Sequence, residues 1–202
     1  MNKGQLFVVS GPSGAGKGSI CQRLVKELDV ELSISMTTRA PRPGEIDGVN
    51  YYFVTRDEFI EAIEKGDLLE SAEVYGNYYG TPKNKVYEKL ASGKDVVLEI
   101  DIQGALKVRK ECPQAIYIFI LPPSMTELRK RITGRGSDSP DSIELRLGAT
   151  LTEISYIDKY NYCVINGDLE EAVMRVKAII LAEHSRVSEQ IYELIKNYKE
   201  EL

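Results

Sequence analysis

The sequence predicts an α/β fold in which a parallel β-sheet is flanked by helices. Apolar runs of strand length alternate with helix-periodic segments along most of the chain, which is the pattern of repeated β-α units. In order, the runs and the helices that follow them are Leu6–Val9 and Ser19–Leu28, Val96–Ile100 and Gln103–Lys110, Ile116–Leu121 and Met125–Thr133, and Tyr162–Ile165 and Leu169–Glu183. A glycine-rich loop between the first run and the first helix is the second observation that supports this fold.

That loop is a phosphate-binding motif of the form Gly-x-x-x-x-Gly-Lys. It consists of Gly11, Pro12, Ser13, Gly14, Ala15, Gly16, Lys17, Gly18 and Ser19. Glycine lets backbone N–H groups wrap closely around a phosphate, and Lys17 and the N-terminus of the following helix add positive charge. We therefore predict a P-loop NTPase core. The strict motif has Ser or Thr after the lysine as a Mg²⁺ ligand, but Gly18 stands there and the hydroxyl follows at Ser19.

Composition limits the classes of partner. The chain has 202 residues, with 26 Lys and Arg against 31 Asp and Glu and a net charge of −5. This charge argues against a nucleic-acid or anionic-membrane surface. The cysteines at 21, 112 and 163 lack the spacing of a disulfide framework or a zinc site, and the longest apolar run is far shorter than a membrane span. We expect a cytoplasmic protein.

Helix boundaries carry their own signals. Thr55 with Glu58 and Ser124 with Glu127 are capping boxes, and Asp168 is a helix N-cap. Beyond residue 184 the tail 185–202 is amphipathic, with Ile191, Leu194, Ile195 and Tyr198 on one face. We expect a terminal helix that packs on the core, in preference to one that binds a partner.

Two segments interrupt the β-α alternation. Residues 36–84 form an insert with a strand at Tyr51–Val54 and a helix that ends at Gly66, and residues 128–158 form a basic lid. The core then comprises 4–35, 85–127 and 159–184 of one domain, 4–184. Arg39 and Arg42 lie in a proline-stiffened loop of the insert, where two guanidiniums suit a phosphate better than two solvated charges.

Several motifs resemble the guanylate kinase family, in the family's order and spacing. They are Thr37–Gly48, Gly76–Thr81, Glu99–Gly104, Ile120–Ser124 and Arg131–Gly136, and the resemblance covers Gly4 to about Glu183. It implies a GMP-binding insert, a helical lid, and the reaction of ATP with GMP to give ADP and GDP with Mg²⁺. It also implies that the loop from Gly11 to Ser19 binds ATP.

The resemblance further assigns roles to individual residues. Guanine would be read by Ser35, Glu70 and Thr81, and the GMP phosphate would be held by Arg39, Arg42, Tyr51 and Tyr79. Asp101 stands where the family keeps an acid that positions Mg²⁺ through water, and Glu99 where some members carry Asp, both beside GMP. The alternative for these two acids is helix capping or a solvated strand end.

Phosphoryl transfer depends mostly on positioning and on neutralisation of charge. The resemblance assigns this work to Lys17, Arg39 and Asp101 together with the lid arginines Arg131, Arg135 and Arg146. Arg131 has an alternative partner in Glu127, one helical turn earlier. His184 lies far from every phosphate motif in the sequence, so we do not expect it to be catalytic.

Two other functions remain open at this stage. An inactive guanylate-kinase-like binding module would lack the P-loop lysine, whereas Lys17 is present. A related kinase acting on a ribose phosphate would have no use for guanine readers such as Glu70. Oligomeric state is open as well, with a homodimer among the options.

Overall fold

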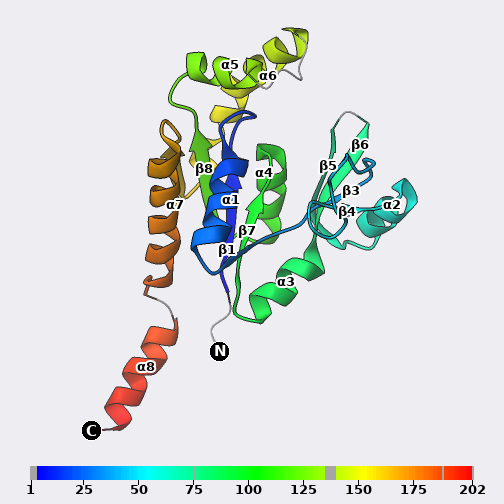
Figure 1. Ribbon diagram of the computed structural model, residues 1–202. Helices are drawn as coiled ribbons and strands as arrows, with labels where there is room; N and C mark the ends of the chain where they lie inside the picture. Colours follow the sequence, from blue (N-terminus) through cyan, green and yellow to red (C-terminus); the bar gives the residue numbers. More distant parts are fainter. Residues whose placement is uncertain (1–3, 75, 135–139, 188, 202) are drawn as a thin grey trace.

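The computed structural model describes residues 4–74, 76–134, 140–187 and 189–201. Its centre is a sheet with the order β2-β7-β1-β8-β9, in which every neighbouring pair is parallel. The strands are β1 (Leu6–Ser10), β2 (Val30–Leu32), β7 (Asp95–Glu99), β8 (Ile116–Leu121) and β9 (Tyr162–Ile165). The predicted α/β core is confirmed, and its middle strand β1 leads directly into the glycine-rich loop (Figure 1).

Helices cover both faces of this sheet. On one face, Phe7 and Val9 pack with α1 (Lys17–Glu27) and α7 (Leu169–His184). On the other, Leu6 and Val8 pack with α3 (Lys83–Ala91) and α4 (Ile102–Glu111). Successive strand residues point to opposite faces, so an uninterrupted apolar run such as β1 fits only between two layers of helices.

The predicted helix starts are present in the structure. Thr55 and Glu58 form a complete capping box before α2 (Arg56–Glu64). Asp168 accepts a hydrogen bond from the backbone N–H of Glu171 at 2.9 Å at the start of α7. These caps satisfy N–H groups that have no partner inside the helix, which explains why short sequence signals located them correctly.

A second sheet lies within the range predicted for the insert. Its order is β4-β3-β6-β5, with β3 and β4 parallel and the remaining pairs antiparallel. The strands are β3 (Met36–Thr37), β4 (Tyr52–Phe53), β5 (Leu68–Val74) and β6 (Asn77–Pro82). The sequence analysis predicted only β4 and α2 of this unit, because β3 is very short and β5 and β6 carry polar residues that are buried only through their pairing.

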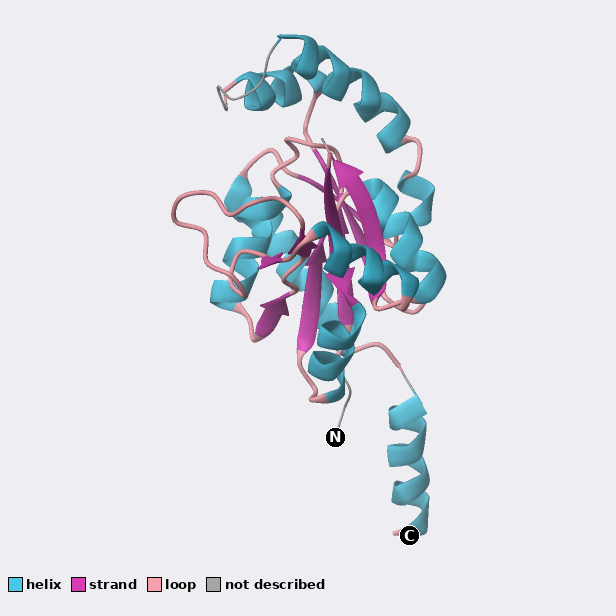
Figure 2. Cartoon of the chain, turned by 90° about the vertical axis from the view of Figure 1, so that its right-hand side faces the viewer, coloured by secondary structure: helices cyan, strands magenta, loops and turns pink. Residues whose placement is uncertain are grey.

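The helices of the lid region lie above the carboxyl ends of the core strands (Figure 2). They are α5 (Met125–Thr133) and α6 (Pro140–Ile154), followed by the short 3₁₀ helix η1 (Ile157–Lys159). Leu128 and Ile132 of α5 form a small apolar cluster with Leu147 of α6. An ion pair between Arg129 and Glu144 joins the same two helices.

The C-terminal helix differs from its prediction. Helix α8 (Glu189–Glu200) forms, but it projects away from the body of the molecule, and every residue from Ile191 to Glu201 is exposed (Figures 1 and 2). The expected packing on the core is therefore wrong. Helix α7 already covers that end of the sheet, and the chain turns away after Ser185, so α8 meets no core surface.

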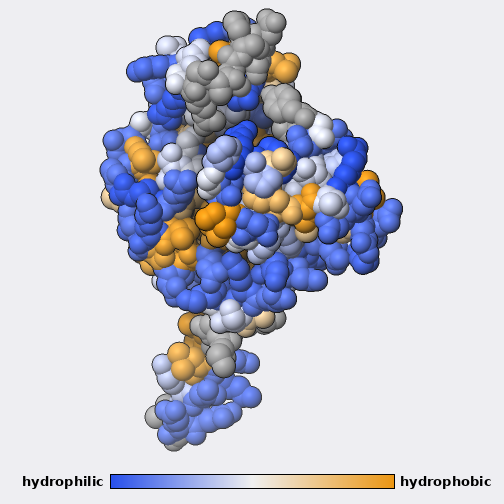
Figure 3. Space-filling model, turned by 45° about the vertical axis from the view of Figure 1, so that its right-hand side comes forward, coloured by the Kyte–Doolittle hydropathy of each residue, from blue (hydrophilic) through white to orange (hydrophobic). Residues whose placement is uncertain are grey.

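The surface seen in Figure 3 is mostly hydrophilic, with apolar residues in small separate groups. Across residues 4–74, 76–134, 140–187 and 189–201, no helix has the length and apolar character needed to cross a lipid bilayer. Cys21, Cys112 and Cys163 are free thiols in the structure.

Candidate active site

The glycines of the phosphate loop are required by its geometry. Gly11, Gly14 and Gly16 have φ values of 145°, 86° and 92°, a region that L side chains rarely adopt. A Cβ on Gly11 would lie 2.2 Å from the carbonyl oxygen of Ile120, and one on Gly16 would lie 2.2 Å from Nδ2 of Asn166. Both the backbone conformation and the close packing therefore exclude larger residues here.

Asn166 holds this loop from the end of β9, the edge strand of the sheet. It follows β9, is buried, and donates from Nδ2 to the carbonyl oxygen of Ala15 at 2.8 Å. The sequence analysis did not name Asn166. Its position at the carboxyl end of a predicted strand was the available signal, but only the fold brings residues 15 and 166 together.

Lys17 lies over the loop that precedes it. Its Nζ donates to the carbonyl oxygens of Gly11 at 2.6 Å and Pro12 at 3.0 Å. Burial lowers the pKa of the Lys17 ammonium, and nearby carboxylates, led by Glu99 and then Glu153, act in the opposite direction. The Lys17 ammonium is therefore held at the phosphate loop by two carbonyl oxygens of that loop.

The absence of a side chain at Gly18 leaves room for an acid. A Cβ on Gly18 would lie 3.2 Å from Oε1 of Glu99, so the Glu99 carboxylate approaches the start of α1 where a strict motif carries a hydroxyl. Ser19 is exposed on the first turn of α1. The charge of Glu99 acts to raise the pKa of both Lys17 and Tyr51.

Glu70 and Thr81 form a buried polar pair in the insert. They are 8% and 0% exposed, and the Thr81 hydroxyl donates to Oε1 of Glu70 at 2.8 Å. Burial raises the pKa of Glu70 to about 7, although the hydrogen bond from Thr81 acts to lower it. A carboxyl group kept in an apolar setting at such a cost points to a role in recognition.

This pair lies beside Asp101. A Cβ on Gly104 would be 3.1 Å from Oε2 of Glu70 and 3.2 Å from Oδ1 of Asp101. Asp101 caps α4, because its Oδ1 accepts from the N–H of Gly104 at 2.6 Å. The helix-capping alternative for Asp101 is therefore present in the structure. Any part of Asp101 in the reaction would use its other carboxylate oxygen, Oδ2.

The predicted GMP-phosphate residues lie together in the insert. The ring centroids of Tyr51 and Tyr79 are 6.0 Å apart, and the guanidinium carbon of Arg39 lies 5.5 Å from the Tyr51 centroid. Arg42 is exposed on the same loop. Ser35 is half-buried before β3, and its carbonyl oxygen accepts from the N–H of Tyr52 at 2.9 Å. Arg39 thus lies beside the two phenols, and Arg42 lies on the same loop as Arg39.

The lid arginines are placed less completely. Arg131 donates from Nε to Glu127 at 2.9 Å and from Nη2 to the carbonyl oxygen of Gly167 at 3.3 Å, so its alternative partner is present. Arg146 is half-buried on α6, and Arg135 lies outside the described residues. Their assignment to the transferring phosphate remains a prediction.

Three site residues were missed from the sequence. Glu45 contacts both arginines of the insert loop, Asn166 holds the phosphate loop, and Glu153 acts electrostatically on Lys17 and Asp101. The regular spacing of Arg39, Arg42 and Glu45 offered a signal for the first. The other two depend on contacts between distant parts of the chain.

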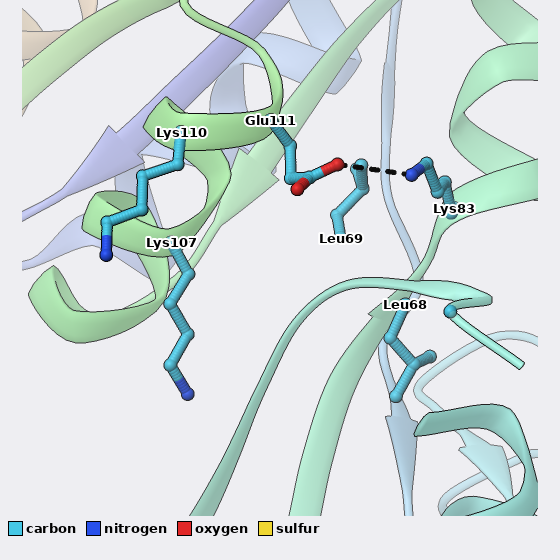
Figure 4. A pocket seen from close by; sticks show the side chains of 7 residues that line it. Leu68, Leu69, Lys83, Lys107, Lys110 and Glu111 are labelled. Carbon is cyan, nitrogen blue, oxygen red and sulfur yellow. Dashed lines mark hydrogen bonds and ion pairs between the residues drawn. The ribbon is translucent and has the colours of Figure 1, made fainter. Parts of the chain in front are cut away.

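A cavity of about 360 Å³ lies at the junction of the insert and the core. Lys83 and Glu111 form an ion pair of 3.2 Å across it (Figure 4). Lys107 donates to the carbonyl oxygen of Ser71. The predicted phosphate and guanine residues do not line this cavity. Its contacts join α4 to the insert, so they bear on the position of the insert relative to the core.

His184 lies at the opposite end of the sheet. Its Nε2 is 2.5 Å from Oδ2 of Asp95, whose Oδ1 accepts from the N–H of Gln5 at 2.8 Å. Asp95 begins β7, whereas the phosphate loop lies at the carboxyl ends of the strands. The contacts of His184 are therefore structural.

Comparison with known proteins agrees with this geometry. Residues 3–183 match the family model of guanylate kinase. The chain belongs to the guanylate kinase family. A guanylate kinase of Clostridium perfringens (strain 13 / Type A) is 54% identical over 202 residues, which cover 100% of this chain and 94% of that protein. A guanylate kinase of Clostridioides difficile (strain 630) is 48% identical over 203 residues, and the match covers 100% of this chain and 99% of that protein.

A solved structure of a guanylate kinase family member supports the same fold. The crystal structure of guanylate kinase from Anaplasma phagocytophilum is 35% identical and has a TM-score of 0.75. The match covers 92% of this chain and 89% of that one. The likeness therefore includes the insert as well as the sheet.

The donor groups fit the Mg²⁺ that the guanylate kinase family implies. Glu99 and Asp101 supply carboxylate oxygens at the end of β7, which suit a hard cation that keeps most of its water. Among the described residues there is no cluster of three or more His, Cys, Asp or Glu side chains able to hold a metal by itself.

Proposed function

We propose that this protein transfers the γ-phosphoryl group of ATP to the phosphate of GMP, giving ADP and GDP. One observation carries the proposal. The buried Glu70–Thr81 pair of the insert lies beside Asp101, which follows β7, and β7 is the strand next to β1 and its phosphate loop. This arrangement supports recognition of a purine with N–H donors close to the loop.

The proposed reaction assigns each group a task. Backbone N–H groups of residues 13–17 and the Lys17 ammonium hold the β- and γ-phosphates. Arg39, Arg42, Tyr51 and Tyr79 hold the acceptor phosphate. An acceptor oxygen forms the new bond to the γ-phosphorus as the bond to the ADP oxygen breaks. Lys17 and the lid arginines Arg131, Arg135 and Arg146 neutralise the charge of the transferred group.

Guanine selection rests on Glu70. An ionised carboxylate accepts from N1–H and from the exocyclic amine of guanine, with hydroxyls of Ser35 and Thr81 toward O6. Adenine has neither donor in that place and would leave a buried carboxylate unpaired. Mg²⁺ supplies charge neutralisation when bound with ATP, and Glu99 and Asp101 are the residues that would hold it, Asp101 through water.

The protein needs no general base for this reaction. The second pKa of a phosphate monoester is about 6, so GMP presents an ionised attacking oxygen at neutral pH. We further infer a cytoplasmic enzyme with small-molecule substrates only, in accord with its acidic charge and free thiols.

A coupled assay of ADP release tests the proposal, with GMP, AMP, CMP and UMP compared in parallel. GMP should be used at least a hundredfold better than AMP in kcat/KM, because two charged hydrogen bonds are lost with adenine and each contributes about 1.5–3 kcal/mol. ADP release that does not depend on GMP, or equal use of AMP, would reject the proposed function.

A further inference from the structure

Glu45 contacts the loop of Arg39 and Arg42, which are proposed to hold the acceptor phosphate, although its negative charge repels a phosphate. Its carboxylate accepts from Nη2 of Arg39 at 2.9 and 3.0 Å through both oxygens. The same carboxylate accepts from the backbone N–H of Arg42 at 2.7 Å. One side chain thus joins the guanidinium of the first arginine to the main chain of the second.

The ion pair is more than a surface contact. The side chains of Arg39 and Glu45 are only 16% and 19% exposed. Nη1 of Arg39 donates to the carbonyl oxygen of Ala40 at 2.8 Å, and the guanidinium lies over the rings of Tyr51 and Phe53 at 5.5 and 5.9 Å. The Arg39 guanidinium is therefore held along one edge by hydrogen bonds and on one face by aromatic rings. It has five N–H donors, more than these contacts use, so donors remain for a phosphate.

The loop itself has little other support. Residues 40–44 are exposed, and Gly44 adopts a φ of 86° with no neighbour within 4 Å of the place of a Cβ. The N–H of Glu45 donates to the carbonyl oxygen of Arg42 at 3.0 Å, which closes a turn between them. Without the carboxylate contacts, the free-energy cost of ordering the Arg39 side chain and the loop backbone would be added to phosphate binding.

We propose that Glu45 is a positioning residue for the acceptor phosphate. It fixes the guanidinium of Arg39 and the backbone at Arg42 in the orientation that receives this phosphate. The free energy gained by this preordering exceeds the electrostatic repulsion between the Glu45 carboxylate and the phosphate. The inference rests on the proposed function, because it assigns the pocket to the phosphate of GMP.

The test compares ligands with and without the phosphate. Binding of GMP and of guanosine is measured by calorimetry for the parent protein, Glu45→Ala and Glu45→Gln, and KM and kcat are measured for both substrates. In Glu45→Ala, the Kd and KM for GMP should rise at least tenfold, while the Kd for guanosine and the KM for ATP stay within twofold. Glu45→Gln, which keeps one acceptor oxygen, should recover part of the loss.

Glu61→Ala provides a matched control. Glu61 forms an exposed ion pair with Lys65 on α2 of the same insert, and its removal should leave all four constants unchanged. Tighter GMP binding in Glu45→Ala would show that Glu45 competes with the phosphate, and an equal loss of guanosine would show damage to the whole insert. Either result, or an unchanged GMP constant, overturns the inference. A parent protein that fails to phosphorylate GMP would instead reject the proposed function.

Discussion

The phosphate loop of the core consists of main chain, whereas the site proposed for the acceptor phosphate in the insert consists of side chains. The first lies in a sharp turn between β1 and α1, held against Ile120 and Asn166 with no room for a Cβ at two of its glycines. The second lies on an exposed loop in which Glu45 joins Arg39 to Arg42. A site built from main chain tolerates no added side chain at its glycines, whereas a site built from side chains depends on how those side chains are oriented. The two sites should therefore respond differently to substitution.

Removal of the lysine charge should have the largest effect. Lys17→Ala is expected to lower kcat by about 100-fold or more, since a positive group aimed at developing charge matters most in the transition state. Melting temperature should fall by no more than a few degrees. Steady-state kinetics and thermal denaturation check this, with Lys26→Ala on the exposed face of α1 as the control. Near-normal turnover in Lys17→Ala would show that the Lys17 charge does not act on the transferred phosphate.

A pair of glycine substitutions compares the two sites directly. Gly16→Ala meets both a strained φ of 92° and a contact of 2.2 Å with Asn166, so it should raise the KM for ATP at least tenfold and lower the melting temperature. Gly44→Ala in the insert has a φ of 86° but open space, so it should cost only about 1–2 kcal/mol of backbone strain. If Gly16→Ala and Gly44→Ala changed the KM values for ATP and GMP equally, the two sites would not differ in the way described.

Replacing the guanine reader should have a selective effect. Glu70→Ala is expected to raise the KM for GMP at least tenfold and to leave the KM for ATP unchanged, because a charged hydrogen bond contributes about 1.5–3 kcal/mol. Kinetics with each substrate varied in turn measure this. Unchanged GMP kinetics would remove Glu70 from the site.

The pKa of about 7 at Glu70 predicts a pH dependence with a definite sign. Guanosine, which lacks the titrating phosphate, should bind more weakly as pH falls below about 7, by up to tenfold per pH unit, because protonation of Glu70 removes an acceptor.

The raised pKa of Glu70 also means that the folded protein binds this proton more tightly than the unfolded chain. Stability from this group is full below about pH 4.5 and is lost as pH rises through 7. Glu70→Gln should flatten the guanosine curve and raise the melting temperature at pH 8 more than at pH 5.

The smallest catalytic effect is expected at His184. His184→Ala should leave kcat and the pH profile with GMP in place, because the residue lies at the far end of the sheet. It should lower the melting temperature by a few degrees, since buried Asp95 loses a partner. A hundredfold loss of turnover in a folded variant would assign the histidine to the chemistry.

Local signals determined much of this molecule. The strands β1, β7, β8 and β9, the helices that follow them, and the capping box at Thr55 were predictable because periodicity and hydrogen-bond needs act over a few residues. The glycine pattern predicted the phosphate loop for the same reason. The roles of individual site residues came from a resemblance to a family, and they remain predictions.

Only the tertiary structure decided what meets across the chain. Asn166 contacts Ala15 because β9 and β1 end at the same edge of the sheet, and Glu70 acquires a raised pKa because the insert folds it away from water against Asp101. The apolar face of α8 predicted that something should cover it, but periodicity specifies a face and not a partner, and in the fold that helix projects from the core. Burial and long-range pairing are collective properties of the packed chain, which no window of sequence contains.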